Sequence, residues 1–254
     1  MMNIHQIDQY LNITADAALE DYMRAFMLKI PFENINVQNN IPISTSTDDL
    51  FDKIIINHRG GFCYELNTFF RAYLTAKGFH AYNAAATVKS PHGWALEGSH
   101  MTTLVQLDRL YIADVGFGDL PMKPVPLSAL EAPDIVDDIN GRFRAIQTGG
   151  RFELQKETDG SFNTLYKGLT DEKSLADFAA MIDYNQHNPQ SIFVQNLLIT
   201  KAQADGRVSM SQDHLTITKN GDKQKIKLTA ENYRELLNKY FGLDTTIDRL
   251  EQLN

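Results

Sequence analysis

The apolar residues of this chain change their spacing at Gly78, and this change constrains the fold more than any other feature. Before Gly78 they recur every three or four residues, most clearly on one side of a segment at Phe62, Leu66, Phe69, Phe70, Tyr73 and Leu74. After Gly78 they tend to alternate with polar residues. The first spacing is typical of amphipathic helices and the second of strands. We therefore predict helices up to about residue 80 and mainly β-structure after it.

Turn residues divide these two regions into separate elements. Hairpin signals stand at Asp108-Arg109, Gly149-Gly150, Asp159-Gly160 and Asn220-Gly221. The predicted strands are 80–88, 101–107, 110–115, 142–148, 151–157, 161–167, 192–200, 206–210, 213–218 and 223–228. The predicted helices are 14–30, a segment from Thr47, 62–77, 172–184 and a last one from Thr229 to Gly242. This order indicates an α+β chain with a helical N-terminal part, an antiparallel meander or small barrel, and a mixed C-terminal part.

Charge and cysteine content exclude several classes of function. The net charge of −8 disfavours non-specific binding to nucleic acid or to an anionic membrane, because both require dense positive charge. A single cysteine excludes an intramolecular disulfide, and no His-x-x-x-His pair indicates a metal site. No apolar run has the length of a membrane span, and the N-terminus lacks the pattern of a signal peptide. We therefore expect a cytoplasmic protein without a metal.

Cys63 stands where a thiol becomes a better nucleophile. Gly60 and Gly61 lead directly into the predicted helix 62–77, so Cys63 falls in its first turn. Unpaired N–H groups and the positive end of the helix dipole favour a thiolate there, and they can also stabilise an oxyanion. A lone cysteine is nevertheless most often a small buried apolar residue. On position alone, that structural role is slightly favoured.

His100 and Asp114 supply the base that a thiol nucleophile needs. His100 begins a predicted strand, and Asp114 ends the strand that follows the turn at Asp108-Arg109. This hairpin would place His100 opposite a residue near 117, a few positions from Asp114. An aspartate at the end of an apolar strand needs a partner, because a buried unpaired carboxylate is unfavourable. We predict a Cys63–His100–Asp114 triad.

Four sequence blocks together resemble the arylamine N-acetyltransferases. They are Ile30-Pro31-Phe32-Glu33-Asn34-Ile35, Arg59-Gly60-Gly61-Phe62-Cys63-Tyr64-Glu65-Leu66-Asn67, His100 before a strand, and Asp114-Val115-Gly116-Phe117-Gly118. They occur in the order and at the spacing of that family over about residues 20–120, and the match weakens beyond residue 120. A weaker match at Asn185, Pro189, Ser191 and Phe193 resembles the family's entry into its third domain.

The resemblance implies a fold and a reaction. The fold would be a helical bundle over 1–80, an antiparallel β-barrel over 81–185 and an α/β lid over 186–254. Acetyl-CoA would acylate Cys63, CoA would leave, and an arylamine or arylhydrazine would take the acetyl group. Phe117 and Phe193 would contact the substrate, and Trp94 would lie near the cofactor. For Trp94, packing at the mouth of the barrel agrees with the sequence about as well as contact with the cofactor does.

The remaining expectations concern the oxyanion site, the residues around the Gly-Gly turn and two rival functions. We expect a backbone N–H near Thr102 or Thr103 to join the Cys63 N–H at the oxyanion, which makes both threonines candidate substrate contacts. Arg59 and Glu33 are expected to hold the Gly-Gly turn, and Glu65 to be solvated. Two rival functions remain open: a thiol amidase or transglutaminase-like enzyme with the same triad, and a non-catalytic binding protein in which Cys63 is merely buried.

Overall fold

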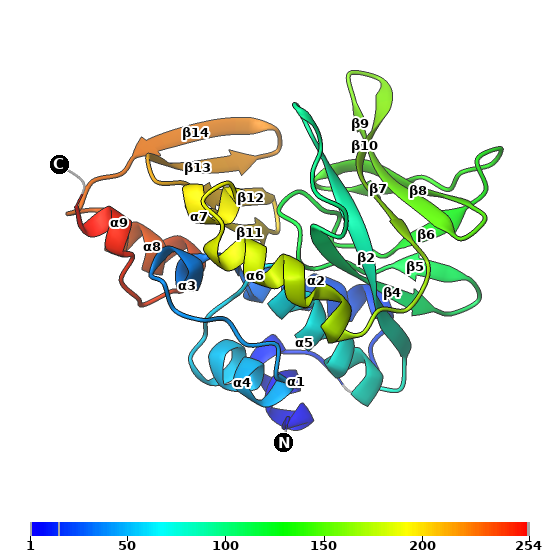
Figure 1. Ribbon diagram of the computed structural model, residues 1–254, viewed down its shortest axis with the longest axis horizontal. Helices are drawn as coiled ribbons and strands as arrows, with labels where there is room; N and C mark the ends of the chain where they lie inside the picture. The colour runs from blue at the N-terminus through cyan, green and yellow to red at the C-terminus, as the bar shows by residue number, and fades with distance from the viewer. Residues whose placement is uncertain (1, 15, 253–254) are drawn as a thin grey trace.

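In a computed structural model, which describes residues 2–14 and 16–252, helices come first and strands follow (Figure 1). The switch at Gly78 is confirmed, because the last N-terminal helix ends at Ala76 and the first long strand begins at His80. The N-terminal elements are α1 Ile4–Leu11, α2 Leu19–Lys29, β1 Phe32–Glu33, α3 Ile35–Gln38, α4 Thr47–Phe51, a π-helical turn Asp52–Ile56 and α5 Cys63–Ala76.

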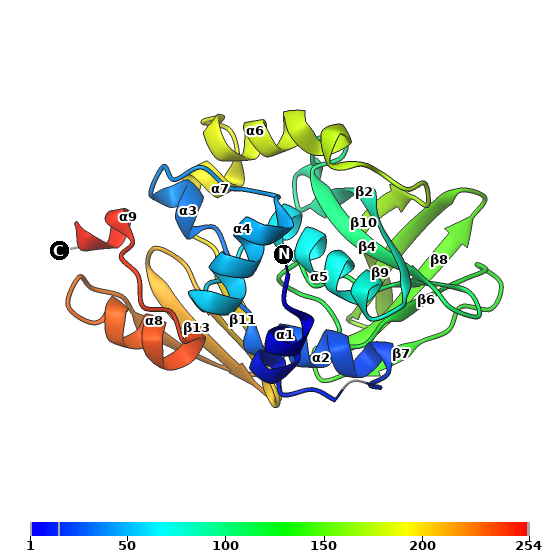
Figure 2. The same cartoon turned by 90° about the horizontal axis from the view of Figure 1, so that it is seen from below.

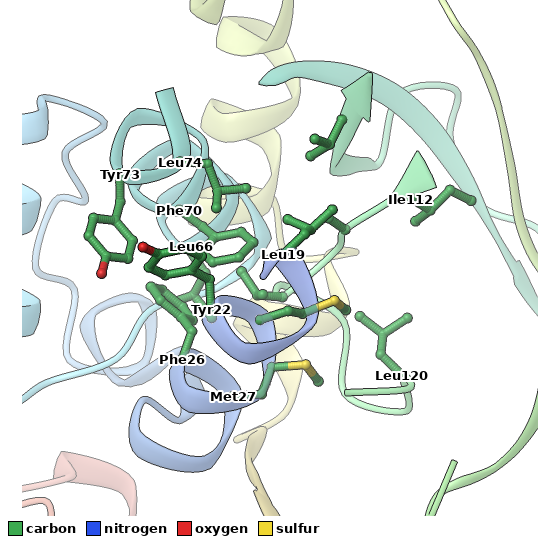
Figure 3. Packing of buried hydrophobic residues seen from close by; sticks show 14 of the residues in the cluster. Leu19, Tyr22, Phe26, Met27, Leu66, Phe70, Tyr73, Leu74, Ile112 and Leu120 are labelled. Atoms are coloured by element: carbon green, nitrogen blue, oxygen red, sulfur yellow. The ribbon is translucent and has the colours of Figure 1, made fainter. Parts of the chain in front are cut away.

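Helix α5 lies at the centre of the molecule and is buried on more than its apolar side. Its predicted apolar stripe packs against α2, where the rings of Phe26 and Phe70 lie 4.9 Å apart (Figure 3). The polar residues Asn67 and Thr68 are also buried, because the barrel covers that side of the helix, and Glu65 is buried against Lys53 and Gly61. Such a helix must pair every buried polar group within the protein.

The first helices differ from the prediction in their starting points. The predicted helix 14–30 begins at Leu19, where the Asp21 carboxylate accepts the Ala18 N–H at 3.0 Å. An additional helix, α1, precedes it, with the Asn3 side chain accepting the Gln6 N–H. We made no prediction for α1, because its eight residues carry only a short apolar pattern.

The middle of the chain forms a closed barrel. Its strands are β2 His80–Ser90, β3 Gly93–Trp94, β4 His100–Gln106, β5 Leu110–Ile112, β6 Val125–Ser128, β7 Val136–Asp138, β8 Gly141–Thr148, β9 Arg151–Thr158 and β10 Ser161–Leu169. The ring runs β2–β4–β5–β6–β8–β9–β10, and β10 pairs with β2 to close it. The predicted antiparallel pairing holds around the ring except between β6 and β8, which are parallel. Closure removes the open edges of a sheet.

The C-terminal part is a second sheet covered by helices. It contains a 3₁₀ turn Leu175–Phe178, α6 Ala179–His187, α7 Ile192–Gln195, β11 Ile199–Gln203, β12 Gly206–Met210, β13 His214–Lys219, β14 Asp222–Lys227, α8 Tyr233–Phe241 and α9 Asp248–Glu251. The strand order is β1–β11–β12–β13–β14, so the N-terminal strand β1 forms one edge of this sheet. Figure 2 shows the N-terminal helices between this sheet and the barrel.

The predicted strand 192–200 is wrong in its first half. Ile192, Phe193 and Val194 belong to α7, where the Ser191 hydroxyl accepts the Phe193 N–H at 3.2 Å. Short apolar runs do not distinguish a strand from a helical turn by their spacing. The proposed division at 185/186 also falls inside α6. The division at 80/81 likewise falls inside β2, after its first residue. We therefore propose that the second unit begins at His80 and the third after α6.

Within the described residues, none of the helices has the length and apolar character needed to cross a membrane.

Candidate active site

Cys63 begins α5 and faces the main cavity of the molecule. The cavity has a volume of about 740 Å³, and Cys63 and His100 line it although each is only 2% exposed. Its wall comes from all parts of the chain, including β1, the residues after β5, α6, α7 and the C-terminal sheet. The predicted position of Cys63 in the first helical turn is confirmed. Its N–H belongs to the N-terminal groups that have no acceptor inside the helix.

His100 connects the cavity to a buried carboxylate. Its Nε2 lies 2.6 Å from Asp114 Oδ2, and the Cys63 side chain is among the groups that raise the pKa of its ring. Since Asp114 occupies Nε2, Nδ1 is the nitrogen that faces Cys63. The hairpin pairs Leu104 with Ile112, so the register brings His100 opposite the residues just after Asp114. The three predicted residues therefore lie together, in the order thiol, imidazole, carboxylate.

Asp114 is fully buried, and each of its oxygens accepts two hydrogen bonds. Oδ1 accepts from Asn67 Nδ2 at 2.9 Å and from the Gly116 N–H at 2.8 Å. Oδ2 accepts from His100 and from the Tyr166 hydroxyl at 2.9 Å. Burial raises the pKa of Asp114, but His100, Asn67 and Gly116 outweigh it and hold the pKa below its ordinary value. The carboxylate is therefore ionised at neutral pH.

This carboxylate also determines the charge of His100. Burial lowers the pKa of His100, but the charge and hydrogen bond of Asp114, with a smaller contribution from Cys63, raise it from 6.5 to about 10. His100 is thus favoured as an imidazolium across neutral pH. An imidazolium beside a thiol favours the thiolate, the form of cysteine that acts as a nucleophile.

Asn67 and Tyr166 hold this arrangement, and the sequence indicated neither role. Asn67 lies one helical turn after Cys63 and binds Asp114, Met101 O and the Val115 N–H. The same helix therefore positions both ends of the triad. Tyr166 comes from β10, and its ring lies 5.0 Å from that of His100. Tyr166 was missed because its contact with Asp114 exists only after the barrel closes; Asn67 carried a weak signal, its four-residue spacing from Cys63.

A buried cluster of charges supports the turn before Cys63. Glu33 Oε1 accepts from Arg59 Nη2 at 2.8 Å, and Glu33 Oε2 accepts the Ile35 N–H at 2.7 Å. The expected Arg59–Glu33 pair is confirmed. The expectation of a solvated Glu65 is wrong: Glu65 is 1% exposed, pairs with Lys53 at 2.7 Å and accepts the Phe62 N–H. Glu65 thus caps α5 from inside the protein.

The two glycines of this turn allow the chain to pack against itself. A Cβ on Gly60 would lie 1.9 Å from the Pro31 carbonyl oxygen, and one on Gly61 would lie 2.7 Å from Glu65 Oε2. The turn also pairs with β1, because the Glu33 N–H donates to Gly61 O at 2.8 Å. The close approach that these two glycines permit is therefore made by neighbouring protein atoms.

The remaining predicted contacts lie in two different environments. Phe117, Phe193 and Trp94 line the cavity, and the Phe117 ring lies 5.4 Å from that of His100. Thr102 and Thr103 are fully buried and are not among the described residues that line the cavity. Their hydroxyls bind Tyr166 and Asn67 instead. Their side chains therefore lie away from the cavity, since β4 is covered on both faces, and the expected contact through a backbone N–H near them stays a prediction.

Two lysines lie beside Trp94 at the cavity. The Nζ atoms of Lys89 and Lys167 lie 4.7 and 4.0 Å from the centre of the Trp94 ring. Both lysines are exposed, and in the described part of the chain neither has a carboxylate within ion-pair distance. This corner of the cavity is therefore positively charged.

The acidic residues of the chain lie elsewhere. None of the cavity-lining residues that the structure describes is an aspartate or glutamate. Nor do residues 2–14 and 16–252 contain three or more His, Cys, Asp or Glu side chains placed to hold a metal ion.

Comparison with known proteins gives a consistent set of similarities. Residues 17–250 match a family model described as N-acetyltransferase. The chain is 30% identical over 225 residues to an uncharacterized acetyltransferase of Bacillus subtilis, covering 87% of this chain and 88% of that protein. It is 30% identical over 221 residues to an arylamine N-acetyltransferase of Escherichia coli, covering 83% of this chain and 77% of that protein. The structure of Mycobacterium marinum arylamine N-acetyltransferase in complex with CoA superimposes with a TM-score of 0.88 at 25% identity, covering 98% of this chain and 97% of that one.

Proposed function

Because the chain belongs to the arylamine N-acetyltransferase family, we propose that it transfers an acetyl group from acetyl-CoA to an aromatic amine or hydrazine through acetyl-Cys63. The observation that carries this proposal is the buried Cys63–His100–Asp114 arrangement opening into the cavity. The family uses acetyl-CoA, and a relative has been solved with CoA bound.

In the first half-reaction the Cys63 thiolate attacks the thioester carbonyl of acetyl-CoA. The C–S bond to CoA breaks, and the His100 imidazolium gives its proton to the departing CoA thiolate. The Cys63 N–H, at the start of α5, lies where it can donate to the oxyanion. The products are acetyl-Cys63 and free CoA. Asp114 orients His100 throughout and balances its charge.

In the second half-reaction the amine nitrogen attacks the acetyl carbonyl of Cys63. Neutral His100 accepts the proton that the nitrogen loses, and the bond to Cys63 Sγ breaks. The amide leaves, and the thiolate–imidazolium pair is restored. The same thiol, base and carboxylate thus serve both halves of a ping-pong reaction.

The charge of the cavity supports an aromatic amine as the acceptor. An alkylamine is protonated at neutral pH and would need a carboxylate to balance its charge, which the described lining residues do not supply. The nitrogen of an aromatic amine is uncharged at that pH. The rings of Phe117 and Phe193 offer flat apolar surface for its ring.

Trp94 and its two lysines support a location for the donor. CoA carries several phosphate charges, and Lys89 and Lys167 are exposed cations at the cavity without carboxylate partners among the described residues. We assign the CoA phosphates to this corner. Trp94 would then be a cofactor contact that also holds the two lysines in place.

Replacing Lys89 or Lys167 with methionine should raise the KM for acetyl-CoA. The expected rise is roughly two- to fivefold for each, because an exposed charge pair contributes little individually. The effect should shrink at high ionic strength, where salt screens exposed charges. Steady-state kinetics at two salt concentrations measure this, with the exposed Lys223→Met on β14 as the control. Equal KM values for acetyl-CoA in the unmodified protein and in all three variants would exclude this corner as the phosphate site.

Intact-mass spectrometry tests the proposed function directly. Incubation with acetyl-CoA alone should add one acetyl group to the protein, and addition of an aromatic amine should remove it. The Cys63→Ala variant should gain nothing. An adduct that persists in Cys63→Ala would contradict covalent catalysis at Cys63. Cleavage of peptides without CoA thioester turnover would favour a thiol amidase instead.

A further inference from the structure

An ion cluster links the segment after Asp114 to both neighbouring sheets. Asp119 Oδ1 and Oδ2 accept from Lys156 Nζ of β9 at 2.8 and 2.9 Å. Asp119 Oδ1 also accepts from Arg207 Nη1 of β12 at 2.7 Å. The same Arg207 nitrogen donates to the Gly118 carbonyl oxygen at 2.6 Å. Asp119 therefore lies between the barrel and the C-terminal sheet and is bound to both.

The two ends of the segment 114–119 are held by different forces. At the first end, Asp114 is bound by four donors, and Gly116 packs so tightly that a Cβ would lie 2.8 Å from Cys63 Cα. At the other end, the cluster of Asp119 with Arg207 and Lys156 supplies the polar attachment. Phe117 lies between these ends. Loss of the cluster should therefore release the Phe117 end of the segment without disturbing the triad.

Phe117 and Arg207 both line the cavity next to this cluster. Phe117 and Gly118 form the wall on the segment, and Arg207 and Thr200 form the wall on the C-terminal sheet. The Arg207 bonds to Gly118 and Asp119 join these two walls. They thereby set the width of the cavity beside the His100 ring, against which Phe117 packs.

We propose that Asp119 is a positioning residue that sets the acceptor pocket: bound by Arg207 and Lys156, it fixes the segment that carries Phe117. This inference rests on the proposed function and deepens it. Asp119 acts on the second half-reaction, in which the aromatic amine binds beside Phe117. The first half-reaction depends on Cys63, His100 and Asp114, whose contacts do not include the cluster.

The partial burial of the cluster makes it a firm attachment. The side chains of Lys156, Arg207 and Asp119 are 20%, 27% and 36% exposed. Such a pair is screened by salt less than a fully exposed one. Because one carboxylate binds two cations from different sheets, substitution at either end of the Asp119–Arg207 pair breaks the same link. The effects of the two substitutions should therefore not add.

The experiment measures the two half-reactions separately in Asp119→Asn, Arg207→Gln and the double variant. Rapid-quench intact mass gives the rate of Cys63 acetylation, which should stay within about twofold of the unmodified protein. Loss of acetyl-Cys63 at increasing aniline concentration gives the KM for the acceptor. That KM should rise roughly 10- to 100-fold, since a displacement of about 1 Å can have an effect of this size. The double variant should be no worse than the worse single variant.

Two further variants and one binding measurement make the outcome of this experiment decisive. Asp119→Glu keeps the charge and should recover part of the acceptor affinity, whereas the exposed Asp134→Asn, which breaks a pair with Arg109, should leave both half-reactions unchanged. Binding of 2-aminonaphthalene to the free protein, followed by its fluorescence, tests the pocket without any chemistry. An unmodified protein that binds this amine but forms no acetyl-Cys63 would contradict the proposed function while the inference still stands. Unchanged acceptor KM and amine binding in Asp119→Asn, or equal slowing of both half-reactions, would overturn the inference.

Discussion

Asparagine in place of Asp114 should lower kcat/KM for acetyl transfer by roughly 10⁴-fold, the loss that the same change causes in a Ser-His-Asp triad. Asp114 accepts four hydrogen bonds, two on each oxygen. The side chain of asparagine accepts only on its amide oxygen. Its NH2 group would therefore face another donor, such as Asn67 Nδ2 or the Tyr166 hydroxyl. His100 would lose both its orientation and its balancing charge.

The pH dependence of Cys63 alkylation reports the same change independently of turnover. Asp114 is the main group that raises the pKa of His100 to about 10, so in the unmodified protein the imidazolium persists above neutral pH. Without that carboxylate the pKa of His100 falls, and the imidazolium is lost at a lower pH. In the unmodified protein the iodoacetamide labelling rate should therefore change with pH only where His100 loses its proton, near pH 10. In Asp114→Asn that change should move to a lower pH.

Two results would count against this account of the triad. A labelling profile that is identical in Asp114→Asn and in the unmodified protein would show that Asp114 does not control the ion pair. Slow labelling of the native unmodified protein at every pH would favour the non-catalytic role of a buried cysteine. Cys63 is the single cysteine of the chain, so every adduct reports on this site.

Glutamine in place of Glu33 should lower the free energy of unfolding by about 3–5 kcal/mol, the range for breaking a buried ion pair on one side. Glu33 is fully buried and binds Arg59, while Lys53 lies 3.8 Å away. Arg59 is itself mostly buried and would lose its carboxylate partner without gaining full hydration, whereas Lys53 keeps its closer pair with Glu65. Urea unfolding followed by circular dichroism measures the change. The matched control is Asp134→Asn, whose exposed ion pair should contribute little.

The difference between Glu33→Gln and the unmodified protein should depend on pH with a defined sign. Burial raises the pKa of Glu33, but Lys53, Arg59 and the Ile35 N–H outweigh it and hold the pKa below 4.5. A carboxylate with a lowered pKa stabilises the fold above its ordinary pKa and loses that contribution as the pH falls through its folded value. The stability difference should therefore be full at neutral pH and shrink below about pH 4.5. A difference that stays constant in acid would exclude the ion pair as its cause.

Local sequence signals were sufficient for the parts of the site that depend on neighbouring residues. The Gly-Gly turn and the amphipathic stripe placed Cys63 at the start of α5. The turn at Asp108-Arg109 set the register that brings His100 near Asp114. Both are short-range relations, in which a few residues determine the geometry.

Contacts that depend on closure of the whole fold were not predictable in this way. Tyr166 reaches Asp114 from β10, and Arg207 reaches Asp119 from β12. Glu65 was expected in solvent because its helix was assumed to have one solvated face, but Lys53 and the Gly60-Gly61 turn cover it there. Thr102 and Thr103 were expected at the oxyanion through a backbone N–H, and the sequence did not show that their side chains lie in a strand covered on both faces.

The pairing of β1 with β11 determines when during synthesis the cavity is completed. Phe32 and Glu33 leave the ribosome early, yet their partners Thr200 and Ile199 lie in the last quarter of the chain. Contacts between distant segments form late, because the intervening chain must first be ordered. The helices and the barrel can form on the nascent chain, but the wall made by β11 and β12 closes only after residues 199–210 have been synthesised. A chain that stops before β11 should therefore carry Cys63, His100 and Asp114 without that wall of the cavity.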